Sequence, residues 1–340
     1  MNIQQAIGQL LDKRDLVTAD MQSVMQQVMT GEATPAQIGG FLVALRMKGE
    51  TVDEVAAAAS VMRSLASTVE LNFDGAIDIV GTGGDSSNTF NVSTCCAFVA
   101  AAAGARVAKH GNRSVSSMSG AADLLETAGV NIDLSPEQVA HCVETVDLGF
   151  MFAQRHHSAM KHAIGPRREM AVRTVFNLLG PLTNPAGAKS QLLGVYDRQW
   201  VRPIAEVLEK LGSDHVIVVH GHDGMDEISV SGPTYIAELK AGEISETTIE
   251  PGQFDLPVSP LSSITVASAA ESLAMVNGVL ANEPGAPRDI VVLNSGAALC
   301  VAGVVDSIEQ GVDLAQRTIA SGAAAKKLSQ LISVTQSFAN

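Results

Sequence analysis

The chain has 340 residues, of which 46% are hydrophobic and 17% are charged, and its formal net charge is −14 at pH 7. This composition provides for a buried core, excludes a disordered chain, and lacks the basic surface expected of a nucleic-acid-binding protein. The four cysteines form no C-x-x-C pair, and no apolar stretch is long enough to span a bilayer. We therefore expect a soluble, cytoplasmic protein with no membrane or nucleic-acid partner. A small basic pocket for a phosphorylated metabolite remains compatible with the acidic charge.

The N-terminal part of the chain is predicted to be helical. Apolar residues recur at helical spacing through residues 1–68, and no strand pattern interrupts them. Thr34 and Pro35 fit a helix N-cap followed by proline at the first helical position. Thr51 and Glu54 fit a capping box at the start of another helix. We predict a small helical domain over residues 1–70.

From residue 71 to residue 340, short β-branched runs alternate with alanine-rich helical runs. The predicted strands are 77–80, 106–109, 192–196, 215–220, 228–230, 235–239 and 290–294. The predicted helices are 94–103, 119–128, 136–145, 199–211, 267–280, 295–303 and 307–320. This alternation is typical of a mostly parallel sheet covered by helices, with a more antiparallel excursion over 228–254. The expected fold class is α/β, with a small N-terminal helical domain and a larger α/β domain.

The first of three polar loops, GTGGD at 81–85, follows a predicted strand and leads to NVST at 91–94. Ligands bind at the carboxyl ends of strands in open α/β sheets. Glycines let backbone N–H groups approach an anion, and the N-terminus of the next helix adds a favourable dipole. The loop thus favours a phosphate or pyrophosphate cradle, with side-chain donors from Asn91, Ser93 and Thr94. A tight turn followed by an N-cap explains the same residues, and the loop is neither a Walker A motif nor G-x-G-x-x-G.

The second loop, KHGNRSVSSMSG at 109–120, also follows a predicted strand. It combines a lysine, a histidine, an arginine and several serines with two glycines. Such a density of phosphate donors is unusual in an acidic protein. We interpret the group as an anion-binding loop, although a solvated basic loop explains any single serine in it.

The third loop carries adjacent carboxylates, Asp226 and Glu227, after the predicted strand 215–220. Paired carboxylates at a strand end are suited to hold Mg²⁺ together with substrate phosphates, and Asp223 could assist. His220 and His222 raise a zinc alternative, but no third soft ligand follows at a familiar spacing. An acidic hairpin turn is the simpler explanation for this loop taken alone.

An arginine-rich stretch at 154–170 offers a bidentate partner for a carboxylate, although it also fits a solvated helix face. The combination is more informative than any single motif. Two anion-binding loops and a carboxylate pair fit a diphosphate substrate with Mg²⁺, and the arginine fits an acceptor that bears a carboxylate.

The motifs also resemble, in order and spacing, those of one enzyme family, the anthranilate phosphoribosyltransferases. They are GTGGD (81–85), NVST (91–94), KHGNRSVSS (109–117), RTVFNLLGPLTNPA (173–186) and DGMDE (223–227). The resemblance covers essentially the whole chain. It implies Mg²⁺-dependent transfer of the phosphoribosyl group of 5-phosphoribosyl-1-diphosphate (PRPP) to the amine of anthranilate, with release of pyrophosphate. This reaction is the second step of tryptophan biosynthesis from chorismate.

The resemblance further implies a nucleoside phosphorylase/phosphoribosyltransferase-like fold, an active site at the hinge between the domains, and a homodimer formed through the helical domain. No residue is implied to act as a covalent nucleophile. The implied PRPP-binding residues are Gly81, Gly84, Asp85, Thr89, Asn91, Val92, Ser93, Thr94, Lys109, His110, Gly111, Asn112, Arg113, Ser114, Val115, Ser116, Ser117 and Ala121. The implied anthranilate-binding residues are Gly81, Asn112 and Arg167, with Arg167 on the carboxylate and with His110, His157 and Gly180 lining the acceptor tunnel. Ser93, Asp226 and Glu227 are implied to bind two Mg²⁺ ions, one of which bridges the diphosphate.

Three positions depart from the family pattern. Met118 and Ala121 stand where many relatives have a basic or polar residue and a serine, so a side-chain contact from position 121 is not assured. Ser158 stands where proline is common, which should alter local stiffness more than chemistry. Two other functions fit parts of the pattern. A pyrimidine nucleoside phosphorylase of the same fold would use free phosphate without a metal on Asp226 and Glu227, and a non-catalytic relative would bind nucleic acid.

Overall fold

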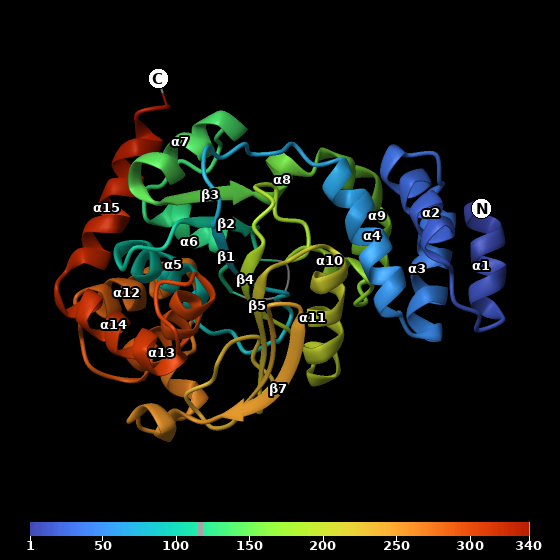
Figure 1. Ribbon diagram of the computed structural model, residues 1–340. Coiled ribbons are helices and arrows are strands. Elements are labelled where there is room, and N and C mark those ends of the chain that lie inside the picture. Colours follow the sequence, from blue (N-terminus) through green and yellow to red (C-terminus); the bar gives the residue numbers. More distant parts are fainter. Residues whose placement is uncertain (115–117, 340) are drawn as a thin grey trace.

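The structure is a computed structural model that describes residues 1–114 and 118–339, so the predictions for Val115, Ser116 and Ser117 lie outside the described residues. Figure 1 shows a helical bundle beside a larger body in which helices cover a central sheet. The bundle is formed by α1 (Ile3–Leu11), α2 (Thr18–Thr30), α3 (Pro35–Lys48) and α4 (Val52–Ser64). The predicted caps are confirmed, because the hydroxyls of Thr34 and Thr51 accept the predicted N–H groups and Pro35 opens α3.

The central sheet has seven strands in the order β3-β2-β1-β4-β5-β6-β7. The strands are β1 (Ile77–Gly81), β2 (Val107–Gly111), β3 (Leu148–Phe152), β4 (Ser190–Gly194), β5 (His215–Gly221), β6 (Thr234–Lys240) and β7 (Glu243–Ile249). The first five are parallel, and β6 and β7 are antiparallel, which confirms the predicted α/β class. The chain builds outward from β1 to β3 on one side and from β4 onward on the other. The carboxyl ends of β1 and β4 therefore form the switch point at which open α/β sheets bind ligands.

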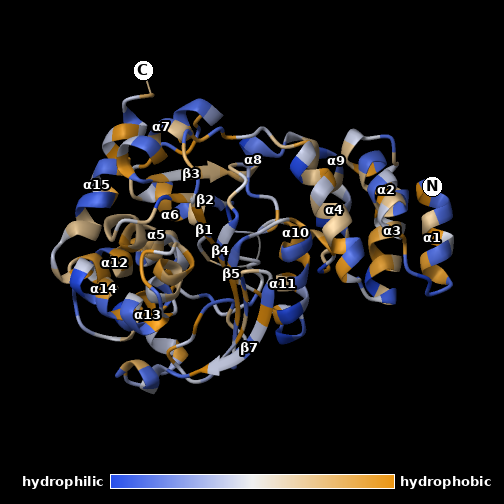
Figure 2. Ribbon diagram, in the orientation of Figure 1, coloured by the Kyte–Doolittle hydropathy of each residue, from blue (hydrophilic) through white to orange (hydrophobic). Residues whose placement is uncertain are grey.

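Most of the remaining helices surround the sheet, whereas α9 lies beside the bundle (Figure 1). They are α5 (Val92–Ala102), α6 (Ala121–Thr127), α7 (Pro136–Val146), α8 (Ala153–His156), α9 (Lys161–Met170), α10 (Phe176–Leu179), α11 (Val201–Lys210), α12 (Ala269–Leu280), α13 (Ala286–Val301), α14 (Ile308–Ala320) and α15 (Ala323–Gln336). Short 3₁₀ turns are Ser158–Met160, Arg198–Trp200, Pro251–Phe254 and Leu261–Ile264. Helices α5 and α13 pack against one face, and α11 packs against the other. In Figure 2 outer helices such as α15 are striped between hydrophilic and hydrophobic residues.

Alternate residues of the central strands enter two separate hydrophobic cores. Leu192 and Ile217 join the core under α5 and α13, whereas Leu193 and Val216 join the core under α11. The second core continues into the bundle, where it includes buried residues of α1 to α4. Helix α9, from the middle of the chain, also packs against α2 and α3. The bundle is therefore fused to one face of the sheet through apolar contacts.

Two of the predicted strands are wrong. Residues 290–294 lie inside α13, which is buried nearly all round, so its β-branched run carries no helical periodicity. Residues 228–230 form no strand, because the Ile228 N–H donates to Asn294 Oδ1 and the Ser229 N–H donates to Thr234 Oγ1. Side-chain oxygens there accept the backbone N–H groups that would otherwise bond to a neighbouring strand. Strands β3 and β7 and helix α15 were not predicted. No helix within the described residues is long and apolar enough to cross a membrane.

Candidate active site

The glycine loop leaves β1 at the switch point and packs directly on the carboxylate loop. The Thr82 N–H donates to the Gly194 carbonyl at 2.9 Å, and the Gly83 N–H donates to Asp226 Oδ2 at 2.6 Å. A Cβ on Gly81 would lie 2.4 Å from the same carboxylate oxygen. Gly83 and Gly84 have φ angles of 63° and 76°, in the left-handed region that favours glycine. The predicted turn between the strand and the helix thus brings the Gly83 amide into close contact with the Asp226 carboxylate.

Helix α5 begins where the glycine loop ends, and Asn91 is its N-cap residue. Instead of capping the helix, the Asn91 amide links two neighbouring segments: it donates to the Ser119 carbonyl at 3.1 Å, and its Oδ1 accepts from the hydroxyls of Ser119 and Ser272. Val92 is buried in the first turn, and Thr89 forms an isolated bridge with Thr265. Asn91 therefore fixes the glycine loop to the serine-rich loop and to α12.

Three carboxylates meet at this point. Burial and the nearby charge of Asp85 raise the pKa of Asp226 to about 7, and burial together with Asp226 raises the pKa of Glu227 well above its usual value. The Ser93 N–H, in the first turn of α5, donates to Glu227 Oε1 at 3.2 Å. Two of the predicted metal ligands, Ser93 and Glu227, are thus brought together, with Asp226 adjacent in sequence.

Lys109 is the cation that faces this acidic cluster. Its ammonium donates to Ser93 Oγ at 3.2 Å and to the Ile79 carbonyl, and the side chain is 3% exposed. Burial lowers the pKa of Lys109, while Asp78 and Glu227 act to raise it. Three carboxyl groups and one buried cation meet here, and the raised pKa values of Asp226 and Glu227 reflect the cost of ionising both acids without further positive charge. Carboxylate and hydroxyl oxygens are the ligands that Mg²⁺ prefers, and this donor set fits that ion.

Of the serine-rich loop after β2, the described residues are only partly directed at the site. His110 is buried, and Gly111 ends β2. Asn112 and Arg113 are exposed, and the Arg113 guanidinium pairs with Asp123 and Glu126 of α6 instead of facing the carboxylate cluster. The Ser114 N–H donates to Asp123 Oδ2 at 3.0 Å. Ala121 is the first residue of α6 and offers no polar side chain.

The residues predicted for the acceptor lie on the bundle side of the switch point. The rings of His110 and His157 are 5.1 Å apart between centroids, and the Gly180 backbone lies next to His110. Burial lowers the pKa of His157 to about 4 and that of His110 well below its usual value. The Nε2 atoms of both rings are buried and make no hydrogen bond within the described residues.

Arg167 lies on α9, with its guanidinium 5.1 Å from the centroid of the Phe176 ring at the start of α10. It makes no hydrogen bond or ion pair with any residue that the structure describes, and burial lowers its pKa. By contrast, Arg63 donates to two backbone carbonyls and Arg173 donates to the Gly84 carbonyl. Arg167 is thus a half-buried cation with no counter-ion among the described residues, which leaves its guanidinium available to an anion.

Sequence reasoning missed a buried polar group that supports the site. Asp78, in the middle of β1, is fully buried; its Oδ1 accepts the His110 N–H at 3.1 Å and its Oδ2 accepts from Asn184 Nδ2 at 2.8 Å. A carboxylate inside an apolar strand is costly unless it is hydrogen-bonded, so Asp78 was itself a signal. The zinc alternative finds no support, since His220 is buried against the Val195 carbonyl and Asp223 accepts from Ser229 and Ser231.

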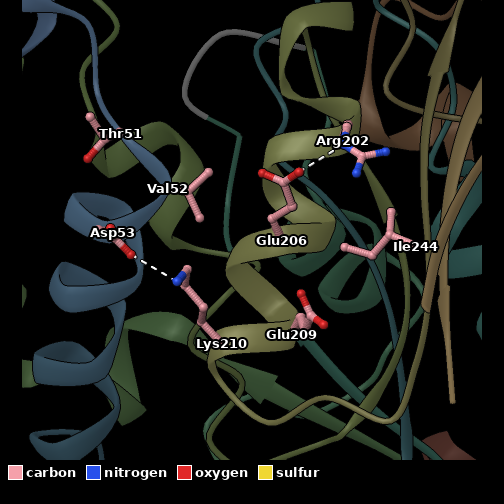
Figure 3. Close-up of a pocket in the computed structure, with 8 residues that line it drawn as sticks. All are labelled: Thr51, Val52, Asp53, Arg202, Glu206, Glu209, Lys210 and Ile244. Carbon is pink, nitrogen blue, oxygen red and sulfur yellow. Dashed lines mark hydrogen bonds and ion pairs between the residues drawn. The ribbon is translucent and has the colours of Figure 1, made fainter. Parts of the chain in front are cut away.

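A hollow of about 520 Å³ lies away from the switch point, between the N-terminus of α4, α11 and β7 (Figure 3). Its charged groups already pair with one another, Asp53 with Lys210 at 3.0 Å and Arg202 with Glu206 at 2.8 Å. The hollow therefore offers little uncompensated charge to a phosphorylated ligand. Its lining is Thr51, Val52, Asp53, Arg202, Glu206, Glu209, Lys210 and Ile244.

Comparisons with known proteins agree with this geometry. Residues 4–66 match the glycosyl transferase family, helical bundle domain, and residues 74–325 match the glycosyl transferase family, a/b domain. A protein of Thioalkalivibrio sulfidiphilus called anthranilate phosphoribosyltransferase is 60% identical over 337 residues, which cover 99% of this chain and 100% of that protein. A protein of the same name from Marinomonas sp. is 57% identical, with 99% and 98% covered.

Solved structures give the same result. The anthranilate phosphoribosyltransferase of Thermus thermophilus superposes with a TM-score of 0.92 at 40% identity, covering 97% of this chain and 99% of that one. The enzyme of Saccharomyces cerevisiae in complex with PRPP and Mg superposes with a TM-score of 0.90 at 26% identity, covering 99% and 98%.

Fold and site together define a two-domain glycosyltransferase in which a helical bundle is joined to an α/β domain. The chain belongs to the anthranilate phosphoribosyltransferase family, which confirms the resemblance found in its motifs. The relatives do not favour a pyrimidine nucleoside phosphorylase or a nucleic-acid-binding protein.

Proposed function

We propose that this chain transfers the phosphoribosyl group of PRPP to the amine of anthranilate and releases pyrophosphate. The observation that carries the proposal is the gathering of Asp85, Asp226 and Glu227 between the glycine loop and the first turn of α5. Asp226 accepts the Gly83 N–H, Glu227 accepts the Ser93 N–H, and Lys109 lies beside them. An acidic cluster on an anion cradle suits a polyphosphate that arrives with a divalent cation. Arg167, which has no ion pair among the described residues, suits the carboxylate of the acceptor.

We assign the predicted residues to these two substrates. PRPP would contact Gly81 to Asp85, Thr89, the first turn of α5, Lys109 to Ser114 and the backbone at Ala121. Anthranilate would contact Gly81, Asn112 and Arg167. The helical domain of residues 1–70 and the α/β domain of residues 71–340 would close around both substrates, which would exclude water.

Ser93, Asp226 and Glu227 would hold two Mg²⁺ ions. The ions would supply positive charge for the diphosphate, which neutralises the leaving group as it gathers negative charge. The residues of the chain do the rest. The Gly83 N–H, the amides of the first turn of α5 and Lys109 orient the diphosphate, and Arg167 holds the acceptor with its amine towards the anomeric carbon.

The neutral histidines contribute to the choice of acceptor. Because burial lowers the pKa of His110 and His157, both rings stay uncharged at neutral pH. Arg167 is then the cation that the acceptor carboxylate meets on this side of the site. The aromatic amine of anthranilate is already neutral at pH 7, so displacement through an oxocarbenium-like state needs no strong base.

We further propose that the protein is a cytoplasmic homodimer formed through the helical bundle. Four of its exposed large hydrophobic residues, Leu11, Val17, Val43 and Met47, lie within residues 1–48. Val43 and Met47 are four residues apart on α3 and share one helix face. A second copy would cover this apolar surface. The four cysteines are buried and unpaired, as suits a reducing compartment.

The test is the decay of anthranilate fluorescence when the protein is mixed with anthranilate, PRPP and Mg²⁺. We expect a decay that requires PRPP and stops on addition of EDTA. Folded protein that leaves the fluorescence unchanged, but cleaves a pyrimidine nucleoside with phosphate in EDTA, would contradict the proposal.

A further inference from the structure

A second group of potential metal ligands lies far from the switch point. Among the described residues, the ligand atoms of His215, Glu238 and Cys300 lie within 4.8 Å of one another. His215 opens β5, whereas the proposed active site is built at the carboxyl ends of β1 and β4. Because β4 and β5 are parallel, His215 lies at the amino ends of these strands, opposite the carboxyl ends that form the proposed active site.

The fold brings these three side chains together from three elements. In the antiparallel pair of β5 and β6, Ile217 lies opposite Glu238 and His215 lies opposite Lys240. Side chains alternate along a strand, so His215 shares the face of Ile217 and Glu238 shares the face of Ile236. Ile217 and Ile236 belong to the core beneath α13, the helix that carries Cys300 near its end. The three side chains therefore converge between the sheet and α13.

The ligand set is chemically specific. It combines an imidazole nitrogen, a carboxylate oxygen and a sulfur, three donors that Zn²⁺ accepts together and that Mg²⁺ does not favour. His215 Nε2 lies 2.8 Å from Glu238 Oε1, and Cys300 Sγ makes no hydrogen bond within the described part of the chain. The side chains of His215 and Glu238 are 13% and 30% exposed, which leaves access for an ion and a water molecule as fourth ligand.

The surrounding charges favour a cation. Asp306, just before α14, Glu309, in its first turn, and Glu238 lie close enough to act electrostatically on Cys300, as does Lys240. Three carboxylates and one lysine thus lie near the Cys300 thiol, so negative charge predominates there.

We propose that His215, Glu238 and Cys300 form a binding site for a thiophilic divalent cation, of which Zn²⁺ is the best match. Binding would break the thiol S–H bond, form the metal–sulfur bond and release the proton to solvent. The bound ion would tie β5 and β6 to α13 and so stabilise the α/β domain, independently of the Mg²⁺ site. A His215–Glu238 hydrogen bond packed beside an inert thiol is the alternative that the experiment must exclude.

The test uses Co²⁺ as a spectroscopic substitute for Zn²⁺ on the full chain, with Mg²⁺ present in excess. We expect a sulfur-to-cobalt charge-transfer band that saturates with one ion per chain and that Zn²⁺ removes. Cys300→Ala and His215→Asn should each abolish the band and the rise in Tm that Zn²⁺ gives the unmodified chain. Cys142→Ala is the matched control, because Cys142 is a buried thiol on α7, and it should keep both effects.

Absence of the band at cobalt concentrations well above that of the protein would overturn the proposal. So would a band that survives Cys300→Ala, since the sulfur would then come from another residue. Circular dichroism shows whether each variant is folded. If Cys300→Ala does not fold, His215→Asn tests the same site.

Discussion

Arg167 is the residue whose role can be separated most cleanly from its neighbours. Among the described residues its guanidinium makes no hydrogen bond or ion pair and lies only over the Phe176 ring, so its removal should leave the fold intact. A hydrogen bond to a charged group contributes about 1.5–3 kcal/mol, so Arg167→Ala should raise the KM for anthranilate roughly 10- to 100-fold and change the KM for PRPP little. Arg168→Ala, at the exposed neighbouring position on α9, is the control. An unchanged anthranilate KM would refute the role.

Asp226 should make the metal-free protein sensitive to pH. Its pKa is raised from 3.8 to about 7 in the folded chain, so the protonated carboxyl is the form that the fold favours. Stability from this group is present below about pH 4 and is lost as the pH rises through about 7. In EDTA, the Tm of Asp226→Asn should therefore exceed that of the unmodified chain by roughly 2 °C or more at pH 8, with the gap closing at lower pH. Mg²⁺ should raise the Tm of the unmodified chain more than that of Asp226→Asn.

The control for this experiment is Asp214→Asn, an exposed position just before β5. Its Tm should follow that of the unmodified chain at every pH. If Asp226→Asn did the same, the crowding of carboxylates at the switch point would not be a source of strain in the metal-free protein.

At the scale of elements, the contact between β1 and the carboxylate loop is the most sensitive to volume. A Cβ at position 81 would lie 2.4 Å from Asp226 Oδ2, so Gly81→Ala must push the carboxylate away from the Gly83 N–H. We expect kcat/KM for PRPP to fall by about 100-fold or more, as catalytic groups tolerate little displacement. Gly8→Ala on α1 is the control, because a Cβ there meets nothing within 4 Å. Steady-state kinetics at saturating Mg²⁺ gives kcat/KM for both variants. If Gly81→Ala and Gly8→Ala had the same kcat/KM for PRPP, the contact between Gly81 and Asp226 would not be needed for activity.

The elements also show what a sequence can and cannot reveal. Strands β1, β2, β4, β5 and β6 were predicted, because their β-branched runs are short and end in glycine or polar residues. Residues 290–294 have the same composition but belong to a helix buried on all sides, which removes the periodicity on which the distinction depends. Strand β7 was missed because it is polar and largely exposed at the edge of the sheet.

In the candidate site, too, local motifs could be predicted from the sequence and tertiary contacts could not. The glycine loop and the pair Asp226–Glu227 were visible as local motifs, and their meeting at one point follows from parallel strands. The partners of Arg113 in α6 and the hydrogen bonds of Asp78 depend on tertiary contacts that no local spacing encodes. Residue identity predicted which groups are chemically capable, and packing decided which of them face the site.

At the scale of the whole molecule, the exposed face of α3 should control assembly. Met47 is 78% exposed, and a charge there would have to be buried at the proposed dimer interface. Met47→Glu should convert a dimer into a monomer, measured by light scattering after size-exclusion chromatography. Val258→Glu is the matched control, because Val258 is 67% exposed but lies outside the bundle. An unmodified chain that is monomeric at all concentrations would contradict the proposed assembly.

The carboxylates on the anion cradle have one more consequence for the molecule at rest. Asp226 accepts the Gly83 N–H and Glu227 accepts the Ser93 N–H, so the protein's own acids occupy the donors that the diphosphate is proposed to use. A free anion, such as phosphate, would have to displace these two carboxylates from the N–H groups and would be repelled by their negative charge. An anion that arrives bound to Mg²⁺ brings a cation with which the displaced carboxylates can pair. The cradle should therefore act as a filter, and calorimetry is expected to detect PRPP binding with Mg²⁺ but much weaker binding in EDTA.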